Sequence, residues 1–228
     1  MKKYKMKITA LFPMKAHSER VPNKNMKNFC GRPLYHAVLS TLLQSKYIDK
    51  VIINTDSDII KKDALENFER VVIIDRPKEI QGDFVSMNDI IAYDLKQTDG
   101  EHFLQTHSTN PLLRRQTIDL AIETYFKNLN RFDSLFSVTR LQTRLYWKDG
   151  SPINHNPNEL LRTQDLPPVY EENSSLYIFS KKSFAGAGGR RICNKPQMFE
   201  ISKLEAVDID EPEDWEIAEI LYQRQIRK

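Results

Sequence analysis

The sequence predicts an α/β protein built on a doubly wound, mostly parallel sheet, with helices on both faces and a protruding arm. Two observations carry this prediction. Segments rich in β-branched and aromatic residues alternate with segments of helical period, which is typical of βαβ units around a parallel sheet. The alternation stops at about residues 140–172, where a polar stretch interrupts it. The 228 residues are therefore predicted to form one domain with an inserted arm.

The first part of the chain supplies strands and helices in turn. The expected strands are residues 8–12, 51–54, 71–74 and 103–106. Between them we expect helices at 33–45 and 58–67, and a further helix after Arg115. Pro33 suits a first helical turn, because its fixed φ is helical and its missing N–H would have no partner there.

The second part of the chain departs from this rhythm. Residues 135–138 are expected to form a fifth strand, and residues 144–170 are then rich in Pro, Asn and other polar residues. Asp149-Gly150 is a turn signal, so this stretch is predicted to be a hairpin-like arm. The chain is expected to close with three elements: a strand at 175–179, a last strand at 205–209 and a helix at 212–225.

The composition indicates a soluble, cytoplasmic protein. Lys and Arg number 34 and Asp and Glu 31, so the formal charge of +3 is too small to indicate nucleic acid or a membrane surface as a partner. No apolar run approaches the length of a membrane span, and no signal peptide is recognisable. The two cysteines lack metal-ligand spacing and are expected to be reduced thiols.

A basic loop follows the first expected strand. In open parallel sheets, ligands bind beyond the carboxyl ends of the strands. This loop carries Lys15, Arg20 and Lys24 within ten residues, and converging cations suit the charge of a triphosphate. No glycine precedes Gly31, so the loop fits neither the Gly-x-Gly-x-x-Gly nor the Walker pattern. A solvated basic loop is the alternative, and charge alone leaves both interpretations open.

Two carboxylates stand near the end of the last expected strand. Asp208 and Asp210 are separated by one residue, and side chains at i and i+2 of a strand point to the same side, so both are candidate magnesium ligands. Asp210 also precedes Glu211-Pro212, where a helix is expected to begin. Its alternative role is a helix N-cap, and this alternative is weaker for Asp208.

A polar run, residues 105–114, follows the fourth expected strand at the same edge of the sheet. Thr109 and Asn110 are candidates to bind a base or a ribose. They are equally typical of turns and helix caps, so this run alone does not decide its function.

Taken together, these segments resemble the acylneuraminate and Kdo cytidylyltransferases. In family order and with matching spacing, they are similar to its nucleotide loop (20–25 and 31–34), its Ser-Thr-Asp segment (54–58), its Thr-Ser-Pro-Leu (109–112) and its late metal-binding Asp-x-Asp (208–210). The resemblance covers the chain from about Lys7 to Ala218.

The resemblance implies a single nucleotidyltransferase domain that transfers CMP from CTP to an acidic sugar, acting as a homodimer with Mg²⁺. The implied catalytic residues are Arg20, Lys24 and Asp208, with Asp208 and Asp210 as metal ligands. The implied nucleotide ligands are Lys15, Ser18, Arg20, Lys24, Asn25, Ser86 and Thr109. The implied sugar ligands are Gln105, His107, Arg162, Asn173 and Tyr177. Among these, Arg162 lies in the arm, which in the family is a dimerisation arm that reaches into the neighbouring subunit.

The sequence departs from the family pattern at three places. Lys15-Ala16-His17-Ser18 replaces the usual Arg-Gly-Gly-Ser, and Lys lacks the bidentate fork of Arg. The run between Gln105 and Pro111 is two residues longer than in the family, which leaves open whether Gln105 or His107 faces the sugar. Glu171 and Glu172 stand where sialic-acid enzymes carry an arginine, so these carboxylates would repel an acidic sugar unless cations pair with them.

The implied reaction is in-line attack of a sugar hydroxyl on the α-phosphorus of CTP, with loss of pyrophosphate. Two alternatives remain. A nucleotide-sugar glycosyltransferase also uses an α/β domain and Asp-x-Asp, but normally in mid-chain. A non-catalytic nucleotide-binding module would bind CTP without turnover. Release of pyrophosphate from CTP distinguishes these alternatives from a cytidylyltransferase.

Overall fold

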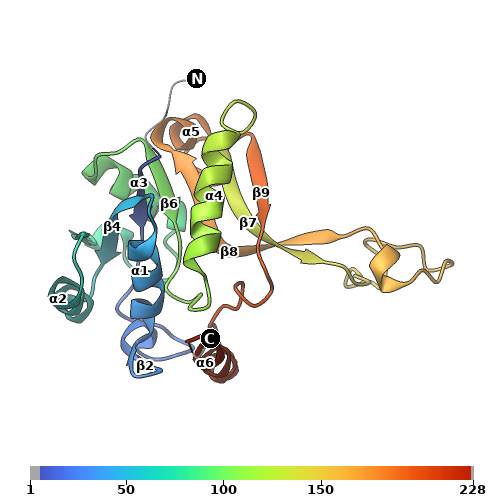
Figure 1. Ribbon diagram of the computed structural model, residues 1–228, viewed down its shortest axis with the longest axis horizontal. Helices are drawn as coiled ribbons and strands as arrows, with labels where there is room; N and C mark the ends of the chain where they lie inside the picture. Colours follow the sequence, from blue (N-terminus) through green and yellow to red (C-terminus); the bar gives the residue numbers. More distant parts are fainter. Residues whose placement is uncertain (1–5, 227–228) are drawn as a thin grey trace.

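A computed structural model describes residues 6–226, and its centre is a seven-stranded sheet (Figure 1). The strands are β1 (Ile8–Leu11), β4 (Ile48–Thr55), β5 (Val71–Asp75), β6 (His102–Gln105), β7 (Ser134–Leu141), β8 (Val169–Ser180) and β9 (Pro196–Glu200). Their order is β5-β4-β1-β6-β8-β7-β9, and only β8 is antiparallel to its neighbours. The mostly parallel sheet predicted from the sequence is therefore confirmed.

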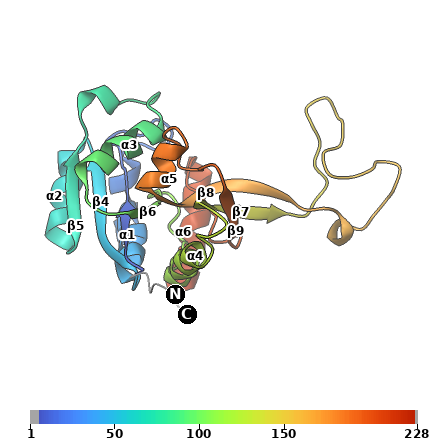
Figure 2. The ribbon, with the colours of Figure 1, turned by 90° about the horizontal axis from the view of Figure 1, so that it is seen from above.

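Helices cover both faces of the sheet (Figure 2). Helices α1 (Leu34–Gln44) and α4 (Arg115–Lys127) pack on one face through a core that includes Tyr35, Leu39 and Ile122. Helices α3 (Met87–Gln97) and α5 (Lys181–Gly186) pack on the other face, where Ile91 and Phe184 lie against Phe103 and Phe179. Helix α2 (Asp58–Asn67) begins at the N-cap Ser57 and lies beside the β5 edge (Figure 2). The doubly wound architecture is confirmed, although α3 and α5 were not predicted from the sequence.

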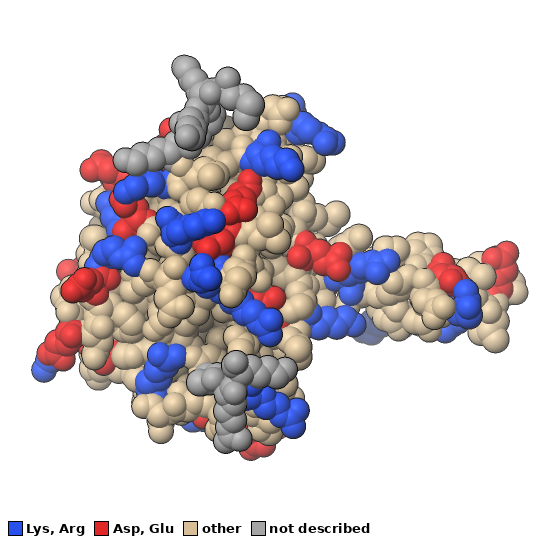
Figure 3. All heavy atoms as spheres, in the orientation of Figure 1, with Lys and Arg blue, Asp and Glu red and all other residues tan. Residues whose placement is uncertain are grey.

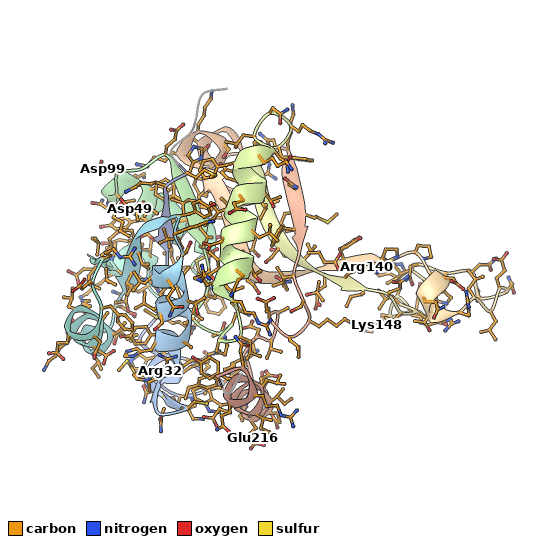
Figure 4. All side chains as sticks on the ribbon, viewed as in Figure 1. Arg32, Asp49, Asp99, Arg140, Lys148 and Glu216 are labelled. Carbon is orange, nitrogen blue, oxygen red and sulfur yellow. The ribbon has the colours of Figure 1, made fainter. Side chains whose placement is uncertain are left out.

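The end of the chain returns to its beginning. Helix α6 (Pro212–Ile226) packs on the small hairpin of β2 (Asn28–Phe29) and β3 (Arg32–Pro33). The Phe29 ring meets the Trp215 ring edge-on at 5.5 Å, and both side chains are buried. Arg32 and Glu216 mark these two elements at the same end of the molecule (Figure 4). This packing brings the residues before α6 to the loop that follows β1.

The predicted last strand, residues 205–209, is wrong. Residues 203–206 form a turn, the segment after it is extended but belongs to no sheet, and the edge strand is β9 instead. Side-chain hydrogen bonds help to fix this segment in place of the backbone hydrogen bonds that pair a strand with its neighbour. The buried Glu205 carboxylate accepts hydrogen bonds from the Arg114 N–H at 3.0 Å and from the Thr117 hydroxyl at 2.7 Å. Ile209 supplied the strand-like apolar pattern because it is buried against α6.

Strands β7 and β8 run past the sheet into the protruding arm, which occupies residues 142–168 between them (Figure 1). The arm contains the short 3₁₀ helix η3 (Thr163–Asp165) and exposes large apolar side chains. Trp147 is 63% exposed and Leu160 is 94% exposed. Arg140 and Lys148 both lie in the part of the arm nearer to the body (Figure 4). The protruding shape matches the prediction, and whether the arm mediates a dimer stays a prediction.

Charged side chains of both signs are interspersed on the face of the molecule shown in Figure 3. Among the helices within residues 6–226, none combines the length and the apolar character that a membrane crossing requires.

Candidate active site

A cavity of about 440 Å³ opens at the carboxyl ends of β1 and β6. It brings together segments that are far apart in the sequence: the loop after β1, the loop before α3, the loop after β6 and Asp210, which precedes α6. The residues predicted from the sequence that line it are Lys15, Ser18, Arg20, Lys24, Asn25, His107, Thr109 and Asp210. The structure therefore places most of the expected nucleotide ligands around one cavity.

Asn25 connects two walls of this cavity. The short 3₁₀ helix η1 (Lys24–Met26) follows Asn23, whose φ of 52° is in the left-handed region that asparagine tolerates better than most residues. The Asn25 amide donates to the Lys15 carbonyl at 3.0 Å and accepts from the Ser108 hydroxyl at 2.6 Å. These bonds fix the basic loop against the loop that follows β6.

Two of the three loop cations, Arg20 and Lys24, are paired with acidic residues before α6, whereas Lys15 pairs with Asp83 in the loop before α3. Arg20 contacts Asp210 at 2.8 Å and Glu211 at 3.1 Å, and these two carboxylates raise the pKa of Arg20. Lys24 donates to the Ile209 carbonyl at 2.6 Å and lies 3.6 Å from the Asp210 carboxylate. Both side chains are held by ion pairs within the protein, which argues against the solvated-loop alternative. A polyanion in the cavity would compete with Asp210 for them.

Asp208 has the burial and, among the described residues, the unpaired carboxylate oxygen expected of a cation ligand. One of its carboxylate oxygens, Oδ1, is buried without a hydrogen-bond partner among the described residues, and the Thr109 side chain hydrogen-bonds to the carboxylate. Burial raises the pKa of Asp208, and the negative charge of Asp210 raises it further. An unpartnered buried carboxylate oxygen beside a second carboxylate fits a magnesium ion, since Mg²⁺ prefers oxygen ligands. No group of three or more His, Cys, Asp or Glu side chains with metal-binding geometry occurs within residues 6–226, so the remaining ligands would be phosphate and water oxygens.

The capping role considered for Asp210 belongs to Asp214. The Asp214 carboxylate accepts from the backbone N–H of Asp210 at 3.0 Å and from that of Glu211 at 2.8 Å. It thereby holds the two residues that lead into α6, as the third residue of a helix does in the reciprocal half of a capping box. The Asp210 side chain is directed instead to Arg20 and Lys24.

A second polar cluster lies beside the cavity. The buried Gln105 amide accepts from Arg191 at 2.8 Å, and Arg191 also donates to the Tyr177 hydroxyl at 3.0 Å while its guanidinium stacks 3.7 Å from the Tyr177 ring. The Tyr177 hydroxyl donates to Glu172, which lies 4.0 Å from Arg191. Arg191 therefore supplies a compensating cation for Glu172.

His107 connects this cluster to the cavity. It lines the cavity and has Nε2 3.3 Å from the Gln105 amide nitrogen. Burial lowers the pKa of His107 to about 4, and the positive charges of Arg191 and Lys24 lower it as well. The imidazole is consequently neutral near pH 7.

Besides Asp208, Gln105 and Tyr177, described above, three more predicted site residues lie away from the cavity lining. Ser86 is the N-cap of α3, where its hydroxyl accepts from the Asn88 N–H at 3.2 Å. Asn173 bridges β7 and β8, accepting from the Ser137 hydroxyl at 2.6 Å and donating to Thr139 at 2.9 Å. Arg162 projects from the arm, 73% exposed, and pairs with Asp165. A ligand contact at each of these residues stays a prediction.

Two arginines of the site were not predicted. Arg76 lines the cavity although it is nearly buried, and it donates to Asn54 at 2.7 Å and to the Met14 carbonyl at 3.1 Å. Arg191 lies in the loop after α5, 86 positions from its partner Gln105. Arg76 follows a strand end directly, which is a signal that could have found it. No local pattern marks Arg191.

Comparison with known proteins agrees with this geometry. A family model described as cytidylyltransferase matches residues 9–227. The chain is 26% identical to a pseudaminic acid cytidylyltransferase of Campylobacter jejuni subsp. jejuni, covering 95% of this chain and 97% of that protein. It is 30% identical to an N-acylneuraminate cytidylyltransferase of Oncorhynchus mykiss, covering 94% of this chain and 50% of that protein.

Solved structures share the fold. A CMP:2-keto-3-deoxy-manno-octonic acid synthetase complexed with CTP superimposes with a TM-score of 0.72 at 12% identity, over 96% of this chain and 99% of that one. A 4-diphosphocytidyl-2C-methyl-D-erythritol synthase from Anaerococcus prevotii gives 0.68 at 16% identity, over 96% and 97%. Because the family model spans nearly the whole sequence, from the first strand to the last helix, the chain belongs to the cytidylyltransferase family of nucleotidyltransferases.

Proposed function

We propose that this protein transfers CMP from CTP to an acidic sugar and releases pyrophosphate. The observation that carries the proposal is the cavity itself, at the ligand-binding edge of a cytidylyltransferase-family sheet: Lys15, Arg20 and Lys24 line it, and Arg20 and Lys24 pair with Asp210 before α6. The relatives named for pseudaminic acid and N-acylneuraminate support an acidic sugar of the nonulosonic type as the acceptor. Because CTP is a cytoplasmic nucleotide, we place the reaction in the cytoplasm.

In the proposed reaction, a hydroxyl oxygen of the sugar attacks the α-phosphorus of CTP. The bond from the α-phosphorus to the bridging oxygen breaks, and the electron pair leaves with pyrophosphate while the sugar hydroxyl loses its proton. Catalysis of such transfers depends on positioning and charge stabilisation. Arg20 and Lys24 would stabilise the charge that develops on the leaving pyrophosphate. Their release from Asp210 would accompany nucleotide binding.

Magnesium fits the site through Asp208 and Asp210. When bound there, the ion would neutralise phosphate charge and help to align the reacting oxygens. Asp208 supplies a buried oxygen that no other described group satisfies, and Asp210 becomes available when the triphosphate takes over Arg20 and Lys24. The Thr109 side chain orients Asp208 for this role.

The acidic sugar requires positive charge beyond the nucleotide. Arg191 and Tyr177 lie on the β8 side of the cavity, and Arg191 balances Glu172 there. We propose that a second copy of the chain adds the partner's Arg162, because the arm carries this residue away from the body of its own subunit (Figure 1). The active form would therefore be a homodimer.

The proposal is tested by measuring pyrophosphate release from CTP, UTP, ATP and GTP, each with Mg²⁺ and a panel of ulosonic acids and simpler sugar acids. We expect turnover only with CTP and an acidic sugar. A clear preference for UTP or a purine triphosphate would overturn the choice of nucleotide. Binding of CTP without pyrophosphate release on any sugar acid would favour a non-catalytic module.

A further inference from the structure

Three side chains form a chain of hydrogen bonds that ends at the cavity. Arg191 Nη1 donates to Gln105 Oε1 at 2.8 Å, and Gln105 Nε2 lies 3.0 Å from the Thr106 carbonyl and 3.3 Å from His107 Nε2. Gln105 is fully buried, so its amide has no access to solvent. Every polar atom of Gln105 is therefore occupied by the protein itself.

Donor and acceptor identities along this chain are fixed by chemistry. The Arg191 guanidinium has donors only, so it must face the carbonyl oxygen of Gln105 and not its NH₂ group. The Gln105 NH₂ group then points away from Arg191, and its two hydrogens are directed to the Thr106 carbonyl and to His107. Because an NH₂ group can only donate, His107 Nε2 must be the acceptor. A neutral imidazole that accepts at Nε2 carries its proton on Nδ1.

The opposite side of the His107 ring is free to meet a ligand. His107 lines the cavity, and its Nδ1 neither has a hydrogen-bond partner among the described residues nor belongs to their buried unpaired atoms. The pKa of about 4 keeps the ring neutral at ordinary pH, so it does not become a cation with donors on both sides. The N–H on Nδ1 is thus the one polar group of the ring that the described residues leave available to a ligand.

We propose that Arg191 and Gln105 act as positioning residues that hold His107 in its Nδ1–H form, so that His107 donates a hydrogen bond to an anionic oxygen of the bound substrate. This inference deepens the proposed function and rests on it for the identity of the substrates. Two substrate groups offer such an oxygen: a phosphate of CTP and the carboxylate of the acidic sugar. The assignment also gives Gln105 and His107 different roles, because only His107 touches the ligand.

The tautomer can be observed directly. In wild-type protein labelled with ¹⁵N-histidine, at pH 8, we expect the His107 signals of a protonated Nδ1 and an unprotonated Nε2. His107→Asn removes these signals and so assigns them. In Gln105→Glu, which has nearly the same shape, both carboxylate oxygens can only accept. The proton should therefore appear on Nε2. A wild-type Nε2–H form, or an unchanged tautomer in Gln105→Glu, would overturn the proposal.

Binding and turnover then test the donor. Asn can place an amide N–H where His107 has Nδ1, whereas Leu places no donor there. His107→Leu should lose about tenfold or more, as expected for a hydrogen bond to a charged group, and His107→Asn should retain part of what His107→Leu loses. If His107→Leu binds CTP with Mg²⁺ more weakly than the wild type in calorimetry, the acceptor is a phosphate oxygen. A raised KM for the sugar acid with unchanged CTP binding identifies the carboxylate.

Equal behaviour of the Asn and Leu variants in both assays would contradict the donor role. The NMR measurement needs neither substrate nor activity. A correct tautomer in a protein that fails to transfer CMP would therefore refute the proposed function while leaving the positioning relay intact. The reverse result, transfer of CMP by a protein with the wrong tautomer, would refute only the relay.

Discussion

At the scale of single residues, the site depends on opposite charges that already face one another. Asp210 is shared by Arg20, which is about half exposed, and by Lys24, whose side chain is only 11% exposed. The buried lysine also holds the Ile209 carbonyl, so it positions the backbone between the two aspartates. A triphosphate that binds Arg20 and Lys24 would therefore have to displace the Asp210 carboxylate from them.

The two cations can be tested by substitution. Arg20→Ala and Lys24→Ala should each lower kcat by about a hundredfold or more, the scale of a lost transition-state donor. Lys27→Ala is the matched control, because Lys27 lies in the same loop but stacks 4.3 Å from the Trp215 ring and does not line the cavity. Effects of tenfold or less at saturating CTP would return the loop to the solvated alternative.

The two aspartates are separated by their magnesium dependence. Asp208→Asn and Asp210→Asn should each lower activity severely and raise the magnesium concentration needed for half-maximal rate. Asp214→Ala should instead cost about 1 kcal/mol of stability through the lost helix cap, with the magnesium curve unchanged. Rates measured against magnesium concentration decide the matter: an unaltered curve in Asp208→Asn would remove it from the metal site.

The sequence indicated the cavity-lining residues of the first loop better than the polar cluster around Arg191. Lys15, Arg20, Lys24 and Thr109 lie in loops that follow strands β1 and β6, and such strands can be recognised from local pattern. The position of Arg191 depends on a loop closing across the sheet onto Gln105, and its backbone N–H is held by Asn88 of α3, a helix that was not predicted. Contacts of this kind depend on tertiary packing that a local pattern does not contain.

At the scale of elements, α3 is tied to the sheet by a buried acid. Asp94 is fully buried; its Oδ1 accepts from Asn54 of β4 at 2.5 Å, while Oδ2 has no partner among the described residues. Burial raises the pKa of Asp94 to about 7, and the Asn54 hydrogen bond and the Arg76 charge limit the rise. Arg76 donates to the same Asn54 side chain, so this network reaches the cavity wall.

This network predicts a pH-dependent stability. The folded protein keeps the Asp94 proton up to about pH 7, whereas the unfolded chain releases it near pH 4, so stability should fall as pH rises between these values. The contribution is at most about 1.4 kcal/mol per pH unit. Urea unfolding at pH 5 to 8 should show this slope reduced in Asp94→Asn. The exposed control Asp99→Asn should keep it, and equal slopes in all three proteins would contradict the assignment.

The segment before α6 shows why one element was mispredicted. Val207 and Ile209 alternate with polar residues as in a half-buried strand, and the alternation is real because both pack with the cluster around α6. The backbone bonds of this segment, however, go to individual groups: Ile209 N–H to the Thr109 carbonyl at 2.9 Å, and the Val207 carbonyl to Asn110. Period-two burial reports an extended chain and not a paired one.

At the scale of the whole molecule, the arm exposes several large apolar side chains that the body of its own subunit does not cover. Trp147, Leu160 and Tyr146 are all more than half exposed, and Figure 1 shows the arm extending clear of the sheet. Exposed clusters of this kind mark interaction surfaces. The sequence predicted the arm from its polar composition and turn signal, but its partner is not part of the single chain.

We expect a homodimer held by the arm. Sedimentation at micromolar concentration should give a dimer for the wild type and a shift toward monomer for the double variant Trp147→Ala and Leu160→Ala. The matched control is Lys148→Ala, which changes the same region without removing apolar surface. A fully active wild-type monomer would contradict the dimer and the role of the partner's Arg162.

Complementation provides a separate test of the shared site. Arg162→Ala and Lys24→Ala should each be nearly inactive alone. After mixing and subunit exchange, a mixed dimer regains one intact site, giving about a quarter of wild-type activity if subunits pair at random. No recovery in a mixture whose subunits demonstrably exchange would show that Arg162 does not serve the neighbouring site.

The bridge made by Asn173 divides strands β7 and β8 into two parts that are held by different numbers of neighbouring strands. On its inner side, β7 and β8 are locked between β6 and β9, where a shift in register would displace Tyr177 from the site. On its outer side, the two strands pair only with each other before the chain enters residues 142–168. The arm is in this sense structurally separable from the body. Exchanging residues 142–168 for the arm of another family member should leave the sheet and its nucleotide cavity folded as they are, while whatever Arg162 contributes would be exchanged with the arm.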